Sequence, residues 1–283
     1  MIDESPITSR KIGWLSLGAL FSSLLGSPVE WLKNSLVFRP NANVNSSPAE
    51  YGLPYRDVRF GGRDGSTLHG WYIPSLKGPT DSQEPLFIWF HGNGGNIAHR
   101  LSHLRLLYQH VGGSHFLFDY RGYGKSQGKP SVAGILADGR DAITLAHACG
   151  WASGRPVVYF GESLGAAVVV VLAIEAPPSR VILLAPFYSL RAMGNLRLPS
   201  LAFLVDHDLN SARIISQVQR PLLVIHGTDD KTVPFRQGSD LYTLASQPKR
   251  FYAVDGAGHT NVHEVGNVTY AQVIREFVLG PVS

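Results

Sequence analysis

The chain has 283 residues, of which 44% are hydrophobic and 16% are charged, and this composition excludes a disordered or fibrous protein. The length is ordinary for a single α/β domain with a sizeable core. A formal net charge of +4 without a dense run of lysine and arginine argues against a nucleic-acid-binding protein, and the single cysteine, Cys149, excludes an internal disulfide framework.

The first predicted element is an apolar N-terminal segment. Residues 12–29 contain no charge, follow a basic pair, and reach the lower limit of length for a membrane-spanning helix. Large apolar residues at helical spacing also fit an amphipathic helix that lies on a membrane or packs on its own domain. A cleaved signal peptide is a further alternative, although no clear cleavage site follows. We expect residues 1–39 to form a separate segment that contacts a membrane through residues 12–32, so a membrane-associated location is favoured over a cytoplasmic one.

The next elements indicate a hairpin followed by an alternating α/β pattern. Residues 40–54 are rich in Asn, Ser and Pro, which predicts a linker or surface loop. Two strands on either side of a glycine-rich turn indicate a β-hairpin. Apolar runs without polar alternation then alternate with helical segments, which is typical of a parallel sheet between two layers of helices. The expected strands lie at 56–60, 67–73, 86–90, 115–120, 156–160, 180–185, 221–226 and 250–254, and the expected helices lie at 96–110, 131–149, 164–175, 235–246 and 262–279.

These elements predict an α/β fold for residues 40–283: a doubly wound, mostly parallel sheet of about eight strands with an antiparallel N-terminal hairpin. Residues 186–220 interrupt the alternation. Insertions at the carboxyl ends of such strands face the ligand crevice, so we expect a small lid there, and a surface excursion is the alternative. Cys149 lies in a predicted helix and is expected to be a small buried hydrophobe.

Two stretches match Gly-x-Ser-x-Gly, the pattern of a serine nucleophile on a tight turn between a strand and a helix. Ser163 follows the apolar run 156–160 and precedes a run long enough for a buried helix, whose small first residues allow close packing. Ser126 lies in a Gly- and Pro-rich stretch typical of an irregular loop. A phosphate-binding loop is excluded there because Asp119 stands where its first glycine would be. We therefore predict Ser163 as the nucleophile.

A serine hydroxyl needs a base that takes its proton and an acid that orients the base. The chain order Ser, Asp, His is typical of this architecture. Asp229 and Asp230 are both candidates for the acid, because they lie in a loop at the carboxyl end of a predicted strand. His259 follows the last predicted strand after a glycine-rich turn and is the expected base. We expect His263 on the surface and His226 in a structural role.

Acyl transfer places negative charge on the substrate's carbonyl oxygen, which backbone N–H groups stabilise. The N–H of Leu164, directly after the nucleophile, is one expected donor. The loop 91–96 reads His-Gly-Asn-Gly-Gly-Asn, and its glycines let the main chain approach a substrate closely, so Asn93 is the expected second donor. A pyrophosphate site is not supported because G-x-G-x-x-G is absent. No spacing of Cys, His and carboxylates indicates a metal, and no cofactor is expected.

Five strings carry a family resemblance: HGNGGNI at 91–97, FDYRGYGKS at 118–126, GESLG at 161–165, HGTDDKTVP at 226–234 and GAGH at 256–259. With them the chain resembles the α/β-hydrolase superfamily over residues 36–280. It is similar to the branch of membrane-associated serine hydrolases of the bud-emergence and protein-depalmitoylase type. The resemblance implies that Asp230, rather than Asp229, is the triad acid. The chain departs from the family at Glu162, where relatives commonly carry Arg or Gln, and at Ala166, where they often carry Gly.

We therefore expect a cofactor-independent serine hydrolase that cleaves carboxylic esters through an acyl-enzyme, with Ser163, Asp230 and His259 as its triad. The expected substrate is a small-molecule or lipid-like acyl ester. A protein or lipid thioesterase, or a small peptidase, would use the same machinery, because specificity lies in the walls of the pocket. A non-catalytic binding module on this fold is the alternative from a different class.

Overall fold

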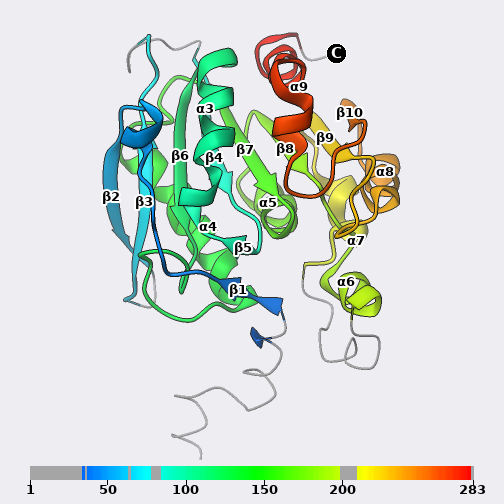
Figure 1. Cartoon of the computed structure of the whole chain (residues 1–283), viewed down its shortest axis with the longest axis horizontal. Helices are drawn as coiled ribbons and strands as arrows, with labels where there is room; N and C mark the ends of the chain where they lie inside the picture. The colour runs from blue at the N-terminus through cyan, green and yellow to red at the C-terminus, as the bar shows by residue number, and fades with distance from the viewer. Residues whose placement is uncertain (1–33, 36, 63–64, 78–83, 198–208, 282–283) are drawn as a thin grey trace, which may run out of the picture.

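The chain is described by a computed structural model over residues 34–35, 37–62, 65–77, 84–197 and 209–281. Its centre is a sheet of eight strands in the order β10-β9-β8-β7-β4-β6-β3-β2 (Figure 1). These strands are β2 (Arg56–Gly61), β3 (Thr67–Ile73), β4 (Leu86–Phe90), β6 (Ser114–Asp119), β7 (Val157–Glu162), β8 (Arg180–Leu184), β9 (Leu222–Gly227) and β10 (Lys249–Val254). Two short strands, β1 (Arg39–Pro40) and β5 (Gly94–Gly95), pair separately.

The pairing of the strands confirms the predicted fold class. Strand β2 pairs with β3 in antiparallel register, β3 pairs with β6 in the same way, and the other neighbours in the large sheet run parallel. The observed strands agree with the predicted ones to within one or two residues at each end. Central strands are buried along their whole length, because helices cover both faces of the sheet.

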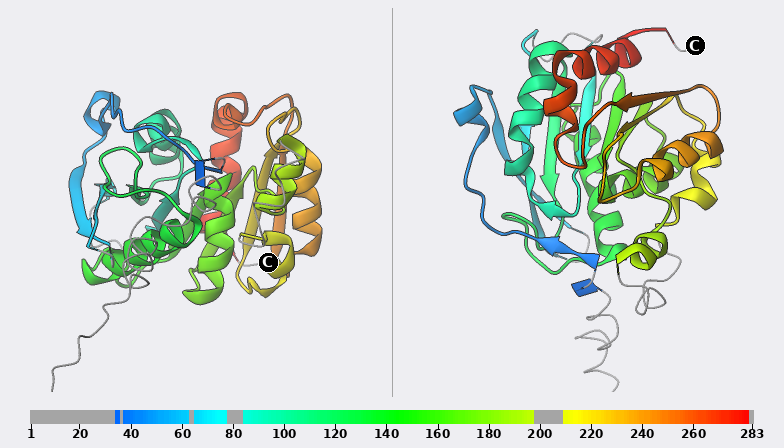
Figure 2. Two further views of the ribbon diagram at one scale, coloured as in Figure 1. Left: turned by 90° about the horizontal axis from the view of Figure 1, so that it is seen from below. Right: turned by 45° about the vertical axis from the view of Figure 1, so that its right-hand side comes forward.

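The helices form two layers, one on each face of the sheet (Figure 2). They are α3 (Leu101–His110), α4 (Val132–Ala148), α5 (Leu164–Glu175), α6 (Leu190–Arg197), α7 (Ser211–Ile214), α8 (Phe235–Leu244) and α9 (Val262–Leu279), with 3-10 turns η1 (Pro48–Tyr51), η2 (Ile97–Arg100) and η4 (Ile215–Gln217). Apolar residues of α4, α5 and α8 belong to one core, and those of α3 and α9 belong to the other. Successive residues of β4 alternate between them: Ile88 and Phe90 join the first core, whereas Phe87 and Trp89 join the second.

The strand order places a switch point beside β4. The chain passes from β4 to β6 on one side and then returns to β7 on the other side. In doubly wound sheets the connections that leave such neighbouring strands diverge and form a crevice at the carboxyl ends of the strands. The loops after β4, β7, β9 and β10 therefore share one edge of the sheet, and they carry Asn93, Ser163, Asp230 and His259 respectively.

Of the two alternatives for residues 40–54, the structure agrees with a surface loop rather than a linker, because the backbone oxygen of Asn41 accepts the N–H of Gly124 (2.9 Å) and the side-chain amide of Asn96 (2.9 Å). One expectation needs correction. Cys149 is exposed rather than buried, because it follows the last turn of α4, where the chain turns towards solvent.

The expectations for the N-terminal segment and for the lid remain predictions. The apolar segment 12–32 lies outside the described residues, as does the part of the insertion at 198–208. The described part of the insertion forms α6, α7 and η4, and its role as a lid is untested. No helix within the described residues is both long and apolar enough to cross a membrane.

Candidate active site

Ser163 lies on a strained turn between β7 and α5. Its φ of 51° and ψ of −108° place a non-glycine residue in the left-handed half of conformational space. The flanking glycines allow this turn. A Cβ at Gly165 would lie 1.8 Å from the carbonyl oxygen of Phe90, and one at Gly161 would lie 2.6 Å from the carbonyl oxygen of Gly165. The Gly-x-Ser-x-Gly pattern is therefore a packing requirement, since any larger residue would push helix α5 away from the sheet.

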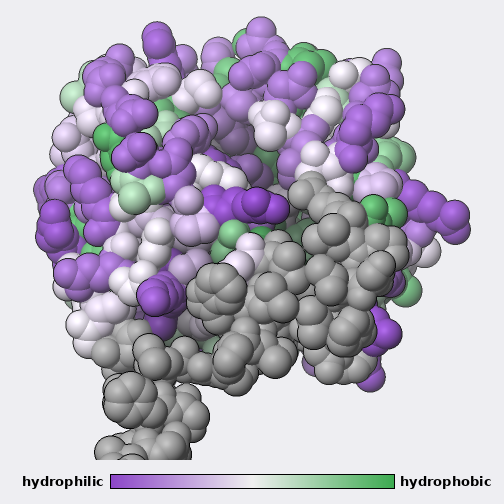
Figure 3. Space-filling view, turned by 60° about the horizontal axis from the view of Figure 1, so that its bottom comes forward, coloured by the Kyte–Doolittle hydropathy of each residue, from purple (hydrophilic) through white to green (hydrophobic). Residues whose placement is uncertain are grey.

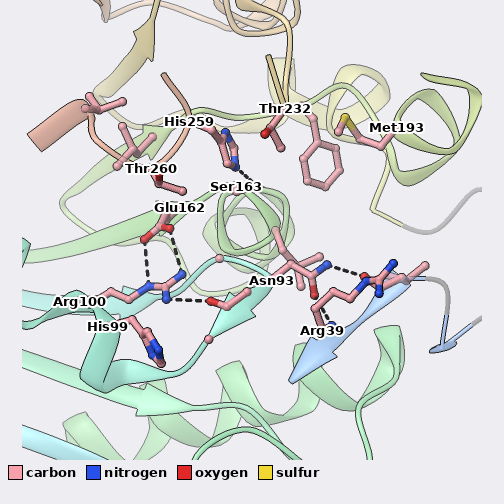
Figure 4. A pocket seen from close by; sticks show the side chains of 18 of the residues that line it. Arg39, Asn93, His99, Arg100, Glu162, Ser163, Met193, Thr232, His259 and Thr260 are labelled. Carbon is pink, nitrogen blue, oxygen red and sulfur yellow. Dashed lines mark hydrogen bonds and ion pairs between the residues drawn. The ribbon is translucent and has the colours of Figure 1, made fainter. Parts of the chain in front are cut away.

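The side chains of Ser163, His259 and Asp230 form a continuous hydrogen-bonded line. His259 Nε2 lies 3.1 Å from Ser163 Oγ, and His259 Nδ1 lies 2.7 Å from Asp230 Oδ2. The three residues are 96 and 29 positions apart in the chain, from Ser163 to His259 and from Asp230 to His259. The parallel strands bring them together at one edge of the sheet, and Figure 4 shows His259 directed at Ser163.

The carboxylate of Asp230 is held from several directions. Its Oδ1 accepts the backbone N–H groups of Thr232 and Val233, both at 2.8 Å, and His226 Nε2 lies 3.4 Å from Oδ2. Burial by itself raises the pKa of this carboxyl, but the hydrogen bonds from His226 and His259 outweigh that effect and hold the pKa well below its ordinary value of 3.8. Asp230 is therefore ionised and oriented toward His259 at neutral pH.

The competing residues lie elsewhere. Ser126 Oγ donates to the backbone oxygen of Asp119 (2.7 Å) and accepts the N–H of His69 (2.9 Å), so its hydroxyl is used to fix a loop. Asp229 is exposed, and no hydrogen bond or ion pair joins its side chain to the described residues. His226 is fully buried and lies 2.9 Å from the backbone oxygen of Val233, in agreement with the expected structural role.

Asn93 lies in the loop after β4, and its side chain anchors that loop. The amide oxygen accepts the backbone N–H of Arg39 (3.0 Å) and the hydroxyl of Tyr123 (2.9 Å), while the amide nitrogen donates to the backbone oxygen of Val37. Asn93 and Leu164 line the same cavity as Ser163. Leu164 is the first residue of α5, where a helix leaves its N–H groups without partners inside the helix.

An ion pair joins the loop that carries Asn93 to the turn at Ser163. Arg100 Nη2 and Nε lie 3.0 and 3.3 Å from the two carboxylate oxygens of Glu162, the residue before Ser163. Arg100 Nη1 also donates to the backbone oxygens of Gly94 (2.8 Å) and Asn96 (3.4 Å). Burial raises the pKa of Glu162, but the Arg100 guanidinium more than offsets this, and the pKa lies below its ordinary value of 4.5. Glu162, the unusual residue before Ser163, thus has a specific partner in Arg100.

A cavity of about 840 Å³ opens above Ser163. One side is apolar, with Phe187, Leu190 and Met193 from the insertion. The other side is polar and includes His99 and Arg100 of η2, together with Glu162 (Figure 4). Arg39 and Asn41, from the segment around β1, also line the cavity. The two sides offer different environments to the two ends of a substrate.

A histidine pair under the polar side was not anticipated. His263, expected on the surface, is largely buried and stacks on His103 with ring centroids 4.6 Å apart. His103 Nε2 lies 2.8 Å from the hydroxyl of Tyr270, and burial lowers the pKa of both imidazoles. Arg100 and His103 lay in a predicted helix, and no local motif indicated that they face the site. No group of three or more His, Cys, Asp or Glu side chains in the described part of the chain is arranged to hold a metal ion.

Known proteins are similar to this chain in sequence and in fold. The family model of serine aminopeptidases, S33, matches residues 81–213. The alpha/beta hydrolase domain-containing protein WAV2 of Arabidopsis thaliana is 33% identical over 220 residues, covering 71% of this chain and 70% of WAV2. Protein bem46 of Schizosaccharomyces pombe is 29% identical over 240 residues, covering 82% of this chain and 79% of bem46. The solved esterase Pf2001 of Pyrococcus furiosus has a TM-score of 0.72 at 20% identity, covering 87% of this chain and 99% of that chain.

The sheet order and the turn at Ser163 define an α/β-hydrolase fold, and the sequence comparisons define the group more narrowly. The chain belongs to the α/β-hydrolase superfamily, in the branch that includes bem46. Family membership and fold together support a hydrolase.

Proposed function

We propose that this protein is a serine hydrolase that cleaves carboxylic esters through an acyl-enzyme intermediate. The main observation in support of this proposal is the hydrogen-bonded line from Ser163 through His259 to Asp230 at the base of a partly apolar cavity. The Pyrococcus furiosus protein of similar fold is an esterase, which agrees with this proposal. The chemistry uses only groups of the chain itself.

In the first half-reaction His259 Nε2 takes the proton of Ser163 as the hydroxyl oxygen attacks the acyl carbonyl. For this role Nδ1 must carry the other imidazole proton and donate a hydrogen bond to the Asp230 carboxylate, which stays ionised because its pKa is lowered. The imidazolium that forms is then stabilised by the adjacent carboxylate. The proton passes from His259 to the leaving alcohol as the carbon–oxygen bond breaks.

The oxyanion of the tetrahedral intermediate would be stabilised by the backbone N–H groups of Leu164 and Asn93. The helix α5 begins at Leu164, so its partial positive end adds to this effect. In the second half-reaction His259 activates a water molecule, which attacks the acyl carbon and releases the acid and Ser163.

Substitution of Ser163 tests the proposal directly. Ser163→Ala should lose essentially all turnover of p-nitrophenyl esters and all labelling by a fluorophosphonate, while Ser126→Ala, the matched change in the other Gly-x-Ser-x-Gly stretch, should keep its label. Mass-spectrometric mapping should place the label on Ser163. Retained turnover in Ser163→Ala would refute the assignment. An S-acylated peptide assayed beside its oxygen ester would separate an esterase from a thioesterase.

We also propose that residues 12–32 contact a membrane and bring the cavity to lipid-like acyl esters. The support is the uncharged run 12–29 in the sequence. The full chain should float with lipid vesicles, and a variant with Leu17→Glu and Phe21→Glu should not. Equal flotation of both proteins would count against this contact.

A further inference from the structure

The charges of the described residues that line the cavity do not balance. Among its described lining residues, Arg39, Arg100 and Glu162 carry formal charges at neutral pH. Arg100 and Glu162 neutralise each other through their two short contacts. Burial lowers the pKa of His103 and His263, so these imidazoles add no charge at neutral pH. The guanidinium of Arg39 is therefore the surplus charge.

Arg39 is held in place by its backbone. Its N–H donates to the side chain of Asn93 (3.0 Å), and β1 pairs in parallel with β5, with Arg39 opposite Gly94. Its side chain is exposed, and no hydrogen bond or ion pair joins its guanidinium to the described residues. Figure 4 shows this side chain beyond Asn93 as seen from Ser163, on the same side as Met193 and opposite Arg100. A fixed backbone thus presents a guanidinium at the rim of the cavity.

A guanidinium in such a position is suited to an anion. Its planar set of N–H donors matches the oxygens of a carboxylate or phosphate, and charge-assisted hydrogen bonds of this kind are about twice as strong as neutral ones. Because the Arg39 side chain is exposed at the rim, it keeps part of its contact with water when an anion binds. Figure 3 shows the face that comes forward from the bottom of Figure 1, and its described part carries hydrophilic side chains beside a few hydrophobic ones.

The same charges disfavour a cationic substrate. An aminopeptidase must bind the free ammonium of its substrate, and an unpaired carboxylate is the usual partner for that group. The carboxylate of Glu162 is already occupied by Arg100, and no other Asp or Glu is among the described residues that line the cavity. The described residues of this cavity therefore offer no free carboxylate for the ammonium of an aminopeptidase substrate, although the matching family model is named serine aminopeptidase.

We propose that Arg39 is the anion-recognition residue of this site, and that the preferred substrates are esters that carry a carboxylate or phosphate within reach of its guanidinium. The inference rests on the proposed ester hydrolysis at Ser163 and adds the charge of the substrate to it. The apolar wall of Phe187, Leu190 and Met193 would take the hydrocarbon part of such a molecule.

A series of matched esters tests this selectivity. The substrates are p-nitrophenyl hexanoate, the corresponding adipate monoester with a terminal carboxylate, the aminohexanoate with a terminal ammonium, and a hexanoate whose nitrophenyl ring carries a carboxylate. We expect one of the two anionic esters to exceed the neutral ester in kcat/KM by about twofold to fivefold, as an ion pair with an exposed side chain allows. Which of the two is preferred tells whether the anion belongs to the acyl or to the leaving group. The aminohexanoate should be the poorest substrate.

Substitution of Arg39 then identifies the cause. In Arg39→Glu the ratio of kcat/KM for the anionic ester to that for the neutral ester should fall below unity, from about twofold to fivefold in the wild type, and in Arg39→Gln it should approach unity. The matched control is Arg59→Glu, which makes the same charge change at an exposed position of β2 and should keep the wild-type ratio. Added salt should lower the wild-type ratio, since an exposed charge is screened.

Three results would overturn the proposal: equal ratios in Arg39→Glu and the wild type, equal effects of Arg39→Glu and Arg59→Glu, or a preference for the aminohexanoate. Calorimetric binding of hexylphosphonate gives a readout that does not depend on turnover. Binding that Arg39→Glu abolishes and Arg59→Glu retains would support the anion site even if no ester were hydrolysed. If the neutral ester is hydrolysed at Ser163 but kcat/KM for the anionic esters does not depend on Arg39, the anion site alone is refuted.

Discussion

The ion pair between Arg100 and Glu162 offers a quantitative test of how the site is assembled. Arg100→Met removes the charge and the N–H donors but keeps much of the apolar stem, and it leaves the Glu162 carboxylate without its partner. It also removes the donors to the backbone oxygens of Gly94 and Asn96, which lie on either side of Gly95 in the loop that carries Asn93. Stability and catalysis should therefore both respond.

The size of the stability effect follows from burial. Loss of one partner from a buried pair costs about 3–5 kcal/mol when the other charge stays buried. The side chains of Arg100 and Glu162 are 10% and 17% exposed, so water reaches the pair and reduces the expected cost of Arg100→Met to about 2–4 kcal/mol. Glu162→Gln keeps its shape and one acceptor oxygen, and we expect about 1–2 kcal/mol. The double variant should reveal a coupling energy of about 1–3 kcal/mol.

The catalytic effect follows from the loop. Loss of one oxyanion donor lowers kcat by about 10²–10³-fold, so a donor that is displaced rather than removed should cost about tenfold to hundredfold. KM should change less, since the donor acts on charge that develops in the transition state. Urea unfolding gives the free energy of unfolding, and p-nitrophenyl hexanoate gives kcat and KM.

Arg140→Met is the matched control. Arg140 also meets a carboxylate through two contacts, to Glu175 at 2.7 and 2.8 Å, but these side chains are 36% and 40% exposed. Its loss should cost less than about 1 kcal/mol and leave kcat unchanged. If Arg100→Met destabilises the protein no more than Arg140→Met does, and kcat is unaffected, the pair has no positioning role and the reasoning is wrong.

Three further predictions concern the turn, the acid and the loop. Gly165→Ala should lower the free energy of unfolding by about 3 kcal/mol or more, because its Cβ would lie 1.8 Å from the Phe90 oxygen. In Gly61→Ala, where nothing lies within 4 Å of the new Cβ, the change should stay below about 1 kcal/mol, and urea midpoints that move equally would contradict the packing account. Asp230→Asn should be less stable than the wild type at neutral pH. In the folded wild type the pKa of the Asp230 carboxyl lies below the ordinary value of 3.8. The difference in stability between the two proteins is therefore fully present above the pKa of this carboxyl in the unfolded chain, and it shrinks as pH falls below about 4. A difference that grows on acidification would refute this reasoning. Asn93→Ala removes three hydrogen bonds that hold the loop and should lower kcat about tenfold with a smaller change in KM, whereas equal kcat values would show that the loop is held by other contacts.

Local sequence patterns were sufficient for the strands of the eight-stranded sheet, for the long helices that cover it and for the turn at Ser163, but not for β1 and β5. Helix α5 was predicted with both of its observed ends, 164 and 175, because Ser163 and the flanking glycines mark its start and the following prolines mark its stop. The choice of Ser163 over Ser126 also followed from what precedes and follows each serine. These are features of neighbouring residues, which a sequence displays directly.

Other features depend on residues that are distant in the chain. Arg100 and Glu162 are 62 positions apart, Arg39 and Asn93 are 54 apart, and His103 and Tyr270 are 167 apart. No local pattern pairs them, and the two aspartates at 229 and 230 were separated only by family resemblance. His263 was wrongly expected on the surface for the same reason.

The sequence by itself therefore determined the order of strands and helices along the chain, the tight turn at Ser163 and the family, because hydrophobic periodicity and glycine spacing act over a few residues. The tertiary structure decided which charges meet. The switch point at β4 brings the loop with Asn93 against the turn at Ser163, so Glu162 is neutralised by Arg100. Among the described residues that line the cavity, it also leaves Arg39 as the surplus charge, which the residue types alone could not specify.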